Sequence, residues 1–249
     1  MAEPVILARR LTARFGADTL FREVSFSVNA GEVFVILGGS GCGKSTLLKL
    51  MIGLVPPAAG RVALLDTDIW TADNQARLAL LRQIGVMWQQ GALFGSLTLA
   101  ENVEMVLAEH TGLNAAARAH VARAKLGLVG LSEAANRLPS EVSGGMLKRA
   151  GIARALALDP PLLFLDEPSA GLDPITSAGL DALILDLART LGTTFVVVTH
   201  ELASILAIGD RCIMLDRQAQ GMIAEGDPRQ LRDSATHPTV RAFFRREAA

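Results

Sequence analysis

Short, uninterrupted apolar runs are the main pattern along this sequence. Three of them, at residues 33–37, 162–165 and 195–198, are rich in Val, Ile, Leu and Phe. Because no polar residues alternate with the apolar ones, each run is typical of a strand buried on both faces, as in a parallel sheet covered by helices. Helical patterns occupy residues 46–52, 177–190 and 201–208. The alternation of strand and helix predicts an α/β fold with a mostly parallel sheet.

Two segments depart from this pattern. Between residues 91 and 158 strand-like runs vanish, and Ala, Leu, Arg and Glu recur at helical spacing. Residues 23–28 alternate between polar and apolar side chains, as in an antiparallel strand with one face in water. We therefore expect a single domain over residues 1–249. Residues 1–90 and 159–249 form its core, which begins with an antiparallel β subdomain, and residues 91–158 form an inserted helical subdomain.

Composition and charge narrow the class of protein. Of the 249 residues, 50% are hydrophobic and 20% are charged, which excludes a disordered or low-complexity chain. Lys and Arg total 24 against 25 Asp and Glu, and this balance argues against a nucleic-acid partner. Two cysteines fit a reducing cytosol. Since no signal peptide and no apolar run of ~18–20 residues is evident, we expect a cytoplasmic protein. If it serves a membrane, another chain must do the crossing.

A glycine-rich segment after the first apolar run carries the strongest chemical signal. It fits the pattern G-x-x-x-x-G-K-[ST] between a predicted strand and a predicted helix. The glycines let successive N–H groups point at one spot, and the helix N-terminus adds partial positive charge, so a turn that binds nothing is the weaker interpretation. Lys44 supplies a full charge to phosphate, Ser45 offers a hydroxyl to Mg²⁺, and Cys42 serves as a small filler. The expected nucleotide-binding residues are Gly38, Gly39, Ser40, Gly41, Cys42, Gly43, Lys44, Ser45 and Thr46.

Polar residues also follow the other two apolar runs. Asp166 and Glu167 come after residues 162–165, and His200 follows residues 195–198 closely. Ligands of parallel α/β sheets bind outside the carboxyl ends of the strands, so we expect these side chains to meet the glycine-rich loop. Asp166 is suited to hold Mg²⁺, Glu167 to act as general base on the attacking water, and His200 to contact the γ-phosphate. Taken alone, each residue is more often a cap or a structural side chain.

A second helix start has anion-binding character. Residues 142–146 read Val-Ser-Gly-Gly-Met and precede a helical run over residues 147–156. Ser143 is a good N-cap, and Gly144 and Gly145 let a ligand approach the backbone.

These motifs resemble, in their order, those of the ATP-binding cassette (ABC) ATPases over nearly the whole chain. The matching pieces are the phosphate loop, a Q-loop glutamine (Gln89), the signature (residues 142–146), the two carboxylates, a D-loop (residues 169–173) and the switch histidine. Phe15 matches the aromatic residue that stacks on adenine. The resemblance implies the ABC ATPase fold, with a P-loop core that binds ATP and Mg²⁺.

The resemblance also implies a mechanism. Two copies face each other head to tail, the phosphate loop and Phe15 of one copy hold ATP, and the signature residues Ser143, Gly144 and Gly145 of the other copy cap it. ATP binding closes the dimer and hydrolysis reopens it. The implied catalytic residues are Lys44, Gln89, Glu167 and His200, and the implied metal ligands are Ser45, Gln89 and Asp166.

The amino-acid sequences of the Q-loop (residues 87–94) and of the signature resemble those of the ATPase subunit of the Mce/Mla-type lipid transporters. This resemblance implies phospholipid or related cargo, an integral membrane permease pair, a lipid-binding protein with an Mce domain, and a position on the cytoplasmic face of the inner membrane. Two residues depart from the common ABC pattern, because Phe15 replaces tyrosine and Met146 replaces glutamine. Other branches, an amino-acid importer or a solvent-efflux ATPase, remain open.

The C-terminal residues 237–247 have the pattern of an amphipathic helix. Its apolar residues Val240, Phe243 and Phe244 are expected to pack on the domain, and the alternative is a dock for a small regulatory subunit. Two further functions are weighed against a transport ATPase. A soluble ABC protein for nucleic acids usually has tandem cassettes, which are absent here, and a non-hydrolysing scaffold is disfavoured because Glu167 and His200 are both present.

Overall fold

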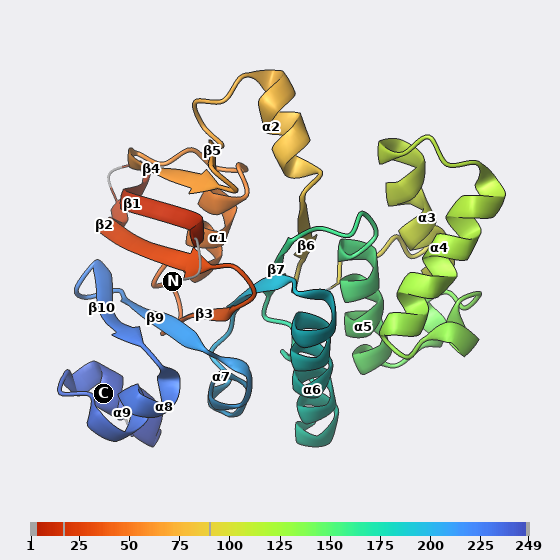
Figure 1. Cartoon of the computed structure of the whole chain (residues 1–249). Helices are drawn as coiled ribbons and strands as arrows, with labels where there is room; N and C mark the ends of the chain where they lie inside the picture. Colours follow the sequence, from red (N-terminus) through yellow and green to blue (C-terminus); the bar gives the residue numbers. More distant parts are fainter. Residues whose placement is uncertain (1–3, 17, 90, 248–249) are drawn as a thin grey trace.

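The computed structural model describes residues 4–16, 18–89 and 91–247, in which strands and helices alternate (Figure 1). The strands are β1 (Pro4–Phe15), β2 (Asp18–Asn29), β3 (Val33–Gly38), β4 (Ala59–Leu64), β5 (Thr67–Asp68), β6 (Ile84–Met87), β7 (Leu162–Asp166), β8 (Thr194–Val198), β9 (Arg211–Asp216) and β10 (Gly221–Gly226). The helices are α1 (Lys44–Met51), α2 (Asn74–Leu81), α3 (Leu99–His110), α4 (Ala115–Leu128), α5 (Gly144–Ala155), α6 (Pro174–Leu191), α7 (Leu202–Ile208), α8 (Pro228–Ser234) and α9 (Pro238–Arg245), with 3-10 turns at Ser132–Ala134 and Pro139–Glu141.

The strands form two sheets. The larger one has the order β10-β9-β3-β8-β7-β6, and its neighbouring strands are parallel except for β10 and β9. The smaller one has the order β2-β1-β4-β5 and is antiparallel. The predicted fold class is therefore confirmed, including the antiparallel N-terminal strand expected at residues 23–28, which is part of β2.

The predicted strands are continuously apolar because both faces of the larger sheet are covered. In β3, Phe34 and Ile36 face α1 and the smaller sheet, where the Phe34 ring stacks on Phe26 with centroids 5.5 Å apart. Val35 and Leu37 face the other way and pack with residues of α7 and α9. All four β3 side chains have 0% exposure. Burying each such side chain contributes about 1.5–3 kcal/mol, so a polar residue on either face would be costly.

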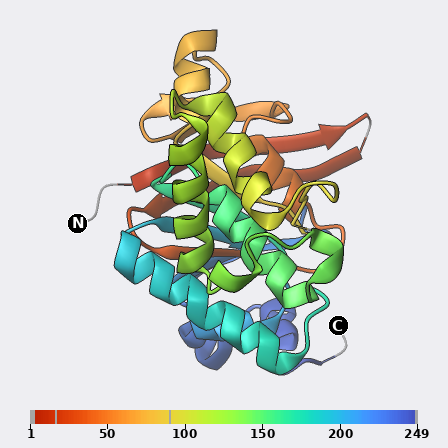
Figure 2. The ribbon, with the colours of Figure 1, turned by 90° about the vertical axis from the view of Figure 1, so that its right-hand side faces the viewer.

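Residues 91–158 contain α3, α4 and α5 and the 3-10 turns, without a strand among the residues that are described (Figure 2). The N-terminus of α3 has a capping box, in which Thr98 N–H donates to Glu101 Oε2 at 2.7 Å and Glu101 N–H donates to Thr98 Oγ1 at 3.2 Å. The buried faces of these helices share one apolar cluster with β7, β8 and α6. The expected helical content of this segment is confirmed.

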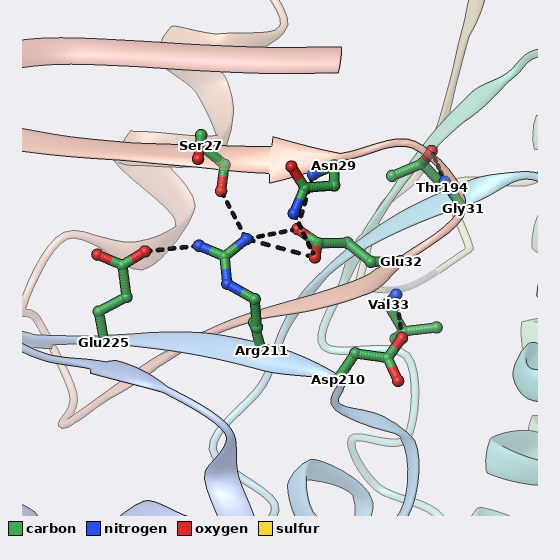
Figure 3. A network of polar contacts seen from close by, with 9 residues as sticks. All are labelled: Ser27, Asn29, Gly31, Glu32, Val33, Thr194, Asp210, Arg211 and Glu225. Carbon is green, nitrogen blue, oxygen red and sulfur yellow. Dashed lines mark hydrogen bonds and ion pairs between the residues drawn. The ribbon is translucent and has the colours of Figure 1, made fainter. Parts of the chain in front are cut away.

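An ion-pair network joins the two sheets at the edge where the parallel strands begin (Figure 3). Arg211, the first residue of β9, donates to Glu32 Oε1 at 3.0 Å and to Glu225 Oε1 at 2.6 Å. It also donates to the main-chain oxygen of Ser27 in β2 at 3.2 Å, and its guanidinium lies 5.5 Å from the centroid of the Phe34 ring. Since Arg211 pairs with Phe34 at the start of β3, this network lies at the opposite end of the strands from the glycine-rich loop.

The terminal helix α9 packs on the domain as its pattern predicts. Val240 and Phe244 are buried against β3, β9 and α7, and Phe243 is half-buried beside them. Within the described ranges, no helix combines the length and the apolar character that a membrane crossing requires.

Candidate active site

Three neighbouring strands bring the predicted chemical residues to one edge of the larger sheet. The order β3-β8-β7 places the glycine-rich loop after β3 beside His200, which follows β8, and beside Asp166 and Glu167 at the end of β7. A cavity of about 680 Å³ opens at this edge. It is lined by Leu20, Gly38, Gly39, Ser40, Gly41, Gly43, Lys44, Ser45, Thr46, Gln89, Glu167, His200 and Phe243.

Glycine is required where the loop turns. Gly38 has a φ of +146°, and a Cβ there would lie 2.2 Å from the main-chain oxygen of Leu215. Gly43, at the N-cap of α1, has a φ of +102°, and no side chain among the described residues caps this helix. The first N–H groups of α1 therefore have no side-chain acceptor and are available to an anion in the cavity.

Lys44 and Cys42 have different positions in the loop. The Lys44 Nζ donates to the main-chain oxygens of Gly38 at 2.9 Å and Gly39 at 3.1 Å, so the ammonium lies at the cavity wall. Cys42 is 1% exposed, and burial raises the pKa of its thiol. Its side chain fills space below the loop and only its main chain can reach a ligand, which fits the expected filler role.

Asp166 lies beside Ser45, whose Oγ donates to Asp166 Oδ1 at 3.3 Å. Burial raises the pKa of Asp166, while the Ser45 hydrogen bond and the charges of Lys49 and Lys44 oppose this shift. A nearby cation would stabilise the ionised carboxylate. The carboxylate, the hydroxyl of Ser45 and the amide of Gln89 at the cavity wall offer oxygen ligands of the kind Mg²⁺ prefers. The described residues hold no group of three or more His, Cys, Asp or Glu suited to a metal, so the remaining ligands would come from phosphate and water.

Glu167 is held in an unusual conformation directly after β7. Its φ of +50° lies in the left-handed region, which costs about 1–2 kcal/mol for a residue with a Cβ. Oε1 lies 2.8 Å from His200 Nδ1, and since an ionised carboxylate only accepts, that nitrogen carries the proton. Oε2 is buried and has no hydrogen-bond partner among the described residues. One carboxylate oxygen is thus oriented by His200, and the other is left for a water molecule.

The signature turn lies outside this cavity. Ser143 Oγ accepts a hydrogen bond from Met146 N at 3.3 Å, which makes Ser143 the N-cap of α5, as predicted. Ser143 and Gly144 are exposed, whereas Gly145 is buried against Thr176 at the start of α6. None of the three signature residues lines the cavity of its own chain. The predicted contact of these residues with a nucleotide therefore requires a second copy.

The structure adds residues that no motif indicated. Leu20 of β2 and Phe243 of α9 line the cavity from distant parts of the sequence, whereas the pattern of α9 indicates only packing on the domain or a dock for a regulatory subunit. Lys148 and Arg154 of α5 bind main-chain oxygens of the Q-loop, a role whose only sequence signal is a charged residue on a buried helix face. Phe15 ends β1, but its side chain lies outside the described part of the structure, so its contact with adenine stays a prediction.

Comparisons with known proteins agree with this geometry. The sequence profile described as "ABC transporter" matches residues 21–170. The "Probable ribonucleotide transport ATP-binding protein mkl" of Mycobacterium tuberculosis is 40% identical over 94% of this chain, which spans only 64% of that protein. The "Intermembrane phospholipid transport system ATP-binding protein MlaF" of Escherichia coli is 40% identical over 86% of this chain and 82% of its own length.

A solved structure extends the similarity to three dimensions. The dimeric ATP-binding cassette MJ0796 in a post-hydrolysis state, bound to ADP and Pi, has a TM-score of 0.79 and 30% identity, over 89% of this chain and 98% of that one. The profile match over residues 21–170 includes the glycine-rich loop, the Q-loop, the signature and the two strand carboxylates. The profile match, the relatives and the shared fold together establish that this chain belongs to the ABC transporter family.

Proposed function

We propose that this chain is the ATP-hydrolysing subunit of an ABC transporter that moves phospholipid, or a related hydrophobic lipid, across the bacterial envelope. The observation that carries the ATPase part is the convergence of Lys44, Glu167 and His200 on one cavity, where Glu167 Oε2 is buried and has no hydrogen-bond partner among the described residues. Support for the lipid part comes from the similarity to a protein named for phospholipid transport and from the Q-loop and signature sequences.

The loop after β3 binds the phosphates. The uncapped N–H groups of α1 and the Lys44 ammonium, now held by two loop carbonyls, turn to the phosphate oxygens. Phe15 stacks on the adenine ring. Ser45, Gln89 and Asp166 hold Mg²⁺, which neutralises charge on the phosphates when it is bound with ATP.

Glu167 acts on the attacking water. The His200 hydrogen bond fixes Oε1, so Oε2 is the oxygen that accepts a proton from the water. His200 is 56% exposed at its side chain and can contact the γ-phosphate without leaving Glu167. Burial of the carboxylate at the end of β7 keeps competing water away from the reacting atoms.

Two copies complete the sites. ATP in the cavity of one copy is capped by Ser143, Gly144 and Gly145 of the other, because these residues are remote from the cavity of their own chain. Such a head-to-tail arrangement forms two equal sites in a two-fold symmetric dimer. Residues 1–90 and 159–249 form the nucleotide-binding core, and residues 91–158 form the helical subdomain that carries the signature. The subunit lies on the cytoplasmic face of the inner membrane, bound to permease subunits, a lipid-binding Mce-domain protein and a small regulatory subunit.

Two measurements test the two parts of the proposal separately. The purified chain should hydrolyse ATP in the presence of Mg²⁺, and Glu167→Gln should reduce kcat by about 100-fold or more while ATP still binds. A parent chain that binds ATP but never hydrolyses it would contradict the ATPase assignment. Lipids that copurify with the intact membrane complex should be enriched in phospholipid relative to the surrounding membrane, with the Glu167→Gln complex as control. Transport of an amino acid by the complex would refute the lipid assignment alone.

A further inference from the structure

A buried lysine connects the signature helix to two residues of the proposed active site. Lys148 lies on the first turns of α5, a short distance from the exposed Ser143, yet it is only 7% exposed. Its Nζ donates to the main-chain oxygen of Gln89 and, at 3.3 Å, to that of Glu167. Within the described ranges Lys148 forms no ion pair, so main-chain carbonyls are its hydrogen-bond acceptors.

Packing alone does not explain a charge at this position. Burial lowers the pKa of Lys148, and the charges of Glu167 and Asp166 oppose this shift. A methionine of similar length would fill the same space without the desolvation penalty of an ammonium. The contribution of Lys148 must therefore lie in the groups that its ammonium holds.

The first of these groups is the backbone of Glu167. Its φ of +50° is disfavoured and has to be maintained by hydrogen bonds. Glu167 N–H donates to the Val198 oxygen at 2.8 Å, and the Glu167 oxygen accepts from Ala170 N at 3.2 Å as well as from Lys148. These three bonds come from β8, the D-loop and α5. Because the backbone angles fix the direction of the side chain, they also fix where Oε1 and Oε2 point.

The second group is the Q-loop, which runs along the same face of α5. Besides the contact of Lys148 with Gln89, Arg154 donates to the oxygens of Ala92 at 2.6 Å and Gly91 at 3.2 Å. Gly151, between the two cations on the helix, allows close approach, since a Cβ there would lie 3.2 Å from Gly91 Cα. The Q-loop backbone is thus fixed to the signature helix at both ends of this contact.

We propose that Lys148 is a positioning residue for ATP hydrolysis. Its ammonium binds the main-chain oxygens of Glu167 and Gln89 and thereby keeps the two side chains in the orientation that the reaction needs. The same bonds tie both residues to the helix whose N-terminus meets the nucleotide of the partner copy. The inference rests on the proposed ATPase function. It assigns no contact between Lys148 and the substrate.

The test compares Lys148→Met with Arg149→Met, a matched change at the next position of α5. Arg149 also donates to two main-chain oxygens, but these belong to Val129 and Gly179 and not to Gln89 or Glu167. Lys148→Met should lower kcat by about 10–100-fold, as expected for a misplacement of catalytic groups by up to ~1 Å, with the Kd for ATP changed by less than about threefold. Lys148→Arg should keep most of the turnover, and Arg149→Met should keep kcat within about twofold.

A double variant separates a positioning role from a general structural one. In single-turnover assays, adding Lys148→Met to Glu167→Gln should cause little further loss, because the group that Lys148 orients is already inactive. An equal fractional loss in both backgrounds would overturn the proposal, as would a normal kcat in Lys148→Met. If Lys148→Met does not fold, Lys148→Gln allows the same comparison. A parent chain without ATPase activity would instead contradict the proposed function.

Discussion

The second signature glycine offers a test of how closely the signature helix fits the start of α6. A Cβ on Gly145 would lie 2.5 Å from Thr176 Cγ2, whereas ordinary carbon contacts are about 3.5–4.0 Å, so Gly145→Ala must move the start of α5 and Thr176 apart by about 1 Å. Overpacking of this kind costs about 1–3 kcal/mol, and the gain from replacing a helical glycine returns about 0.5–1 kcal/mol. The expected net loss is about 1 kcal/mol from the middle of these ranges and at most about 2.5 kcal/mol, which corresponds to a fall in Tm of about 2–4 °C and at most about 10 °C for a chain of this size.

Matched variants connect this change in packing to activity. Displacing the helix start by about 1 Å should also lower kcat by about 100-fold. Thr176→Ser removes Cγ2 but keeps the hydroxyl that donates to Asp173 Oδ2 at 2.5 Å, so Gly145→Ala/Thr176→Ser should recover both Tm and kcat. Gly144→Ala should leave Tm unchanged, since its Cβ would lie 3.6 Å from Leu172 Cδ2. If the double variant regains Tm but not kcat, displacement of the helix is not the cause of the lost activity.

Three substitutions remote from the signature test the electrostatic part of the account. Burial raises the pKa of Asp166, so ionisation of this carboxyl lowers the free energy of unfolding as the pH rises through that pKa. Asp166→Asn should therefore raise the Tm at pH 7 without Mg²⁺ and lose this gain below about pH 4, where the carboxyl is protonated in the folded and the unfolded chain. The same substitution should abolish hydrolysis. Asp181→Asn should show the same pH dependence of Tm in calorimetry, because burial also raises the pKa of Asp181. It should keep kcat, because Asp181 does not line the cavity. An unchanged Tm in both variants would refute the reasoning. Arg211→Met leaves the largely buried carboxylate of Glu32 without its cation. The free energy of unfolding measured in urea should fall by about 1–3 kcal/mol, with kcat unchanged. If this fall is no larger than the one caused by Glu225→Gln, Arg211 does not bridge the two carboxylates as described.

The parts of the fold that could be predicted most readily from sequence are those in which burial sets a regular pattern over a whole element. Both faces of β3, β7 and β8 are covered, so their apolar runs are continuous and readily recognised. The edge strand β6 has only four residues and is half-buried, and α2 has a single buried residue, Leu80, so neither has a pattern long enough to identify it.

Among the residues of the candidate site, those defined by side-chain type and spacing could be predicted from sequence, and those defined by contacts with the main chain or by packing could not. The proposed roles of Lys44, Ser45 and Glu167 lie in their side chains, which come at fixed spacing from a strand, and spacing is visible in a sequence. Lys148 and Arg154 act on main-chain oxygens, and every residue has one of those, so no partner residue type accompanies them. Phe243 reaches the cavity only through the packing of α9, which tertiary structure alone defines.

The proposal that two copies share each ATP site is tested most directly by sedimentation, which gives the molecular mass of the Glu167→Gln variant with and without ATP and Mg²⁺. We expect a monomer without nucleotide and a dimer with it, since each copy completes the proposed site of the other. Adding Ser143→Arg at the exposed signature turn should abolish the dimer while ATP still binds to each chain. A chain that stays monomeric at saturating ATP, or a dimer indifferent to Ser143→Arg, would contradict the account.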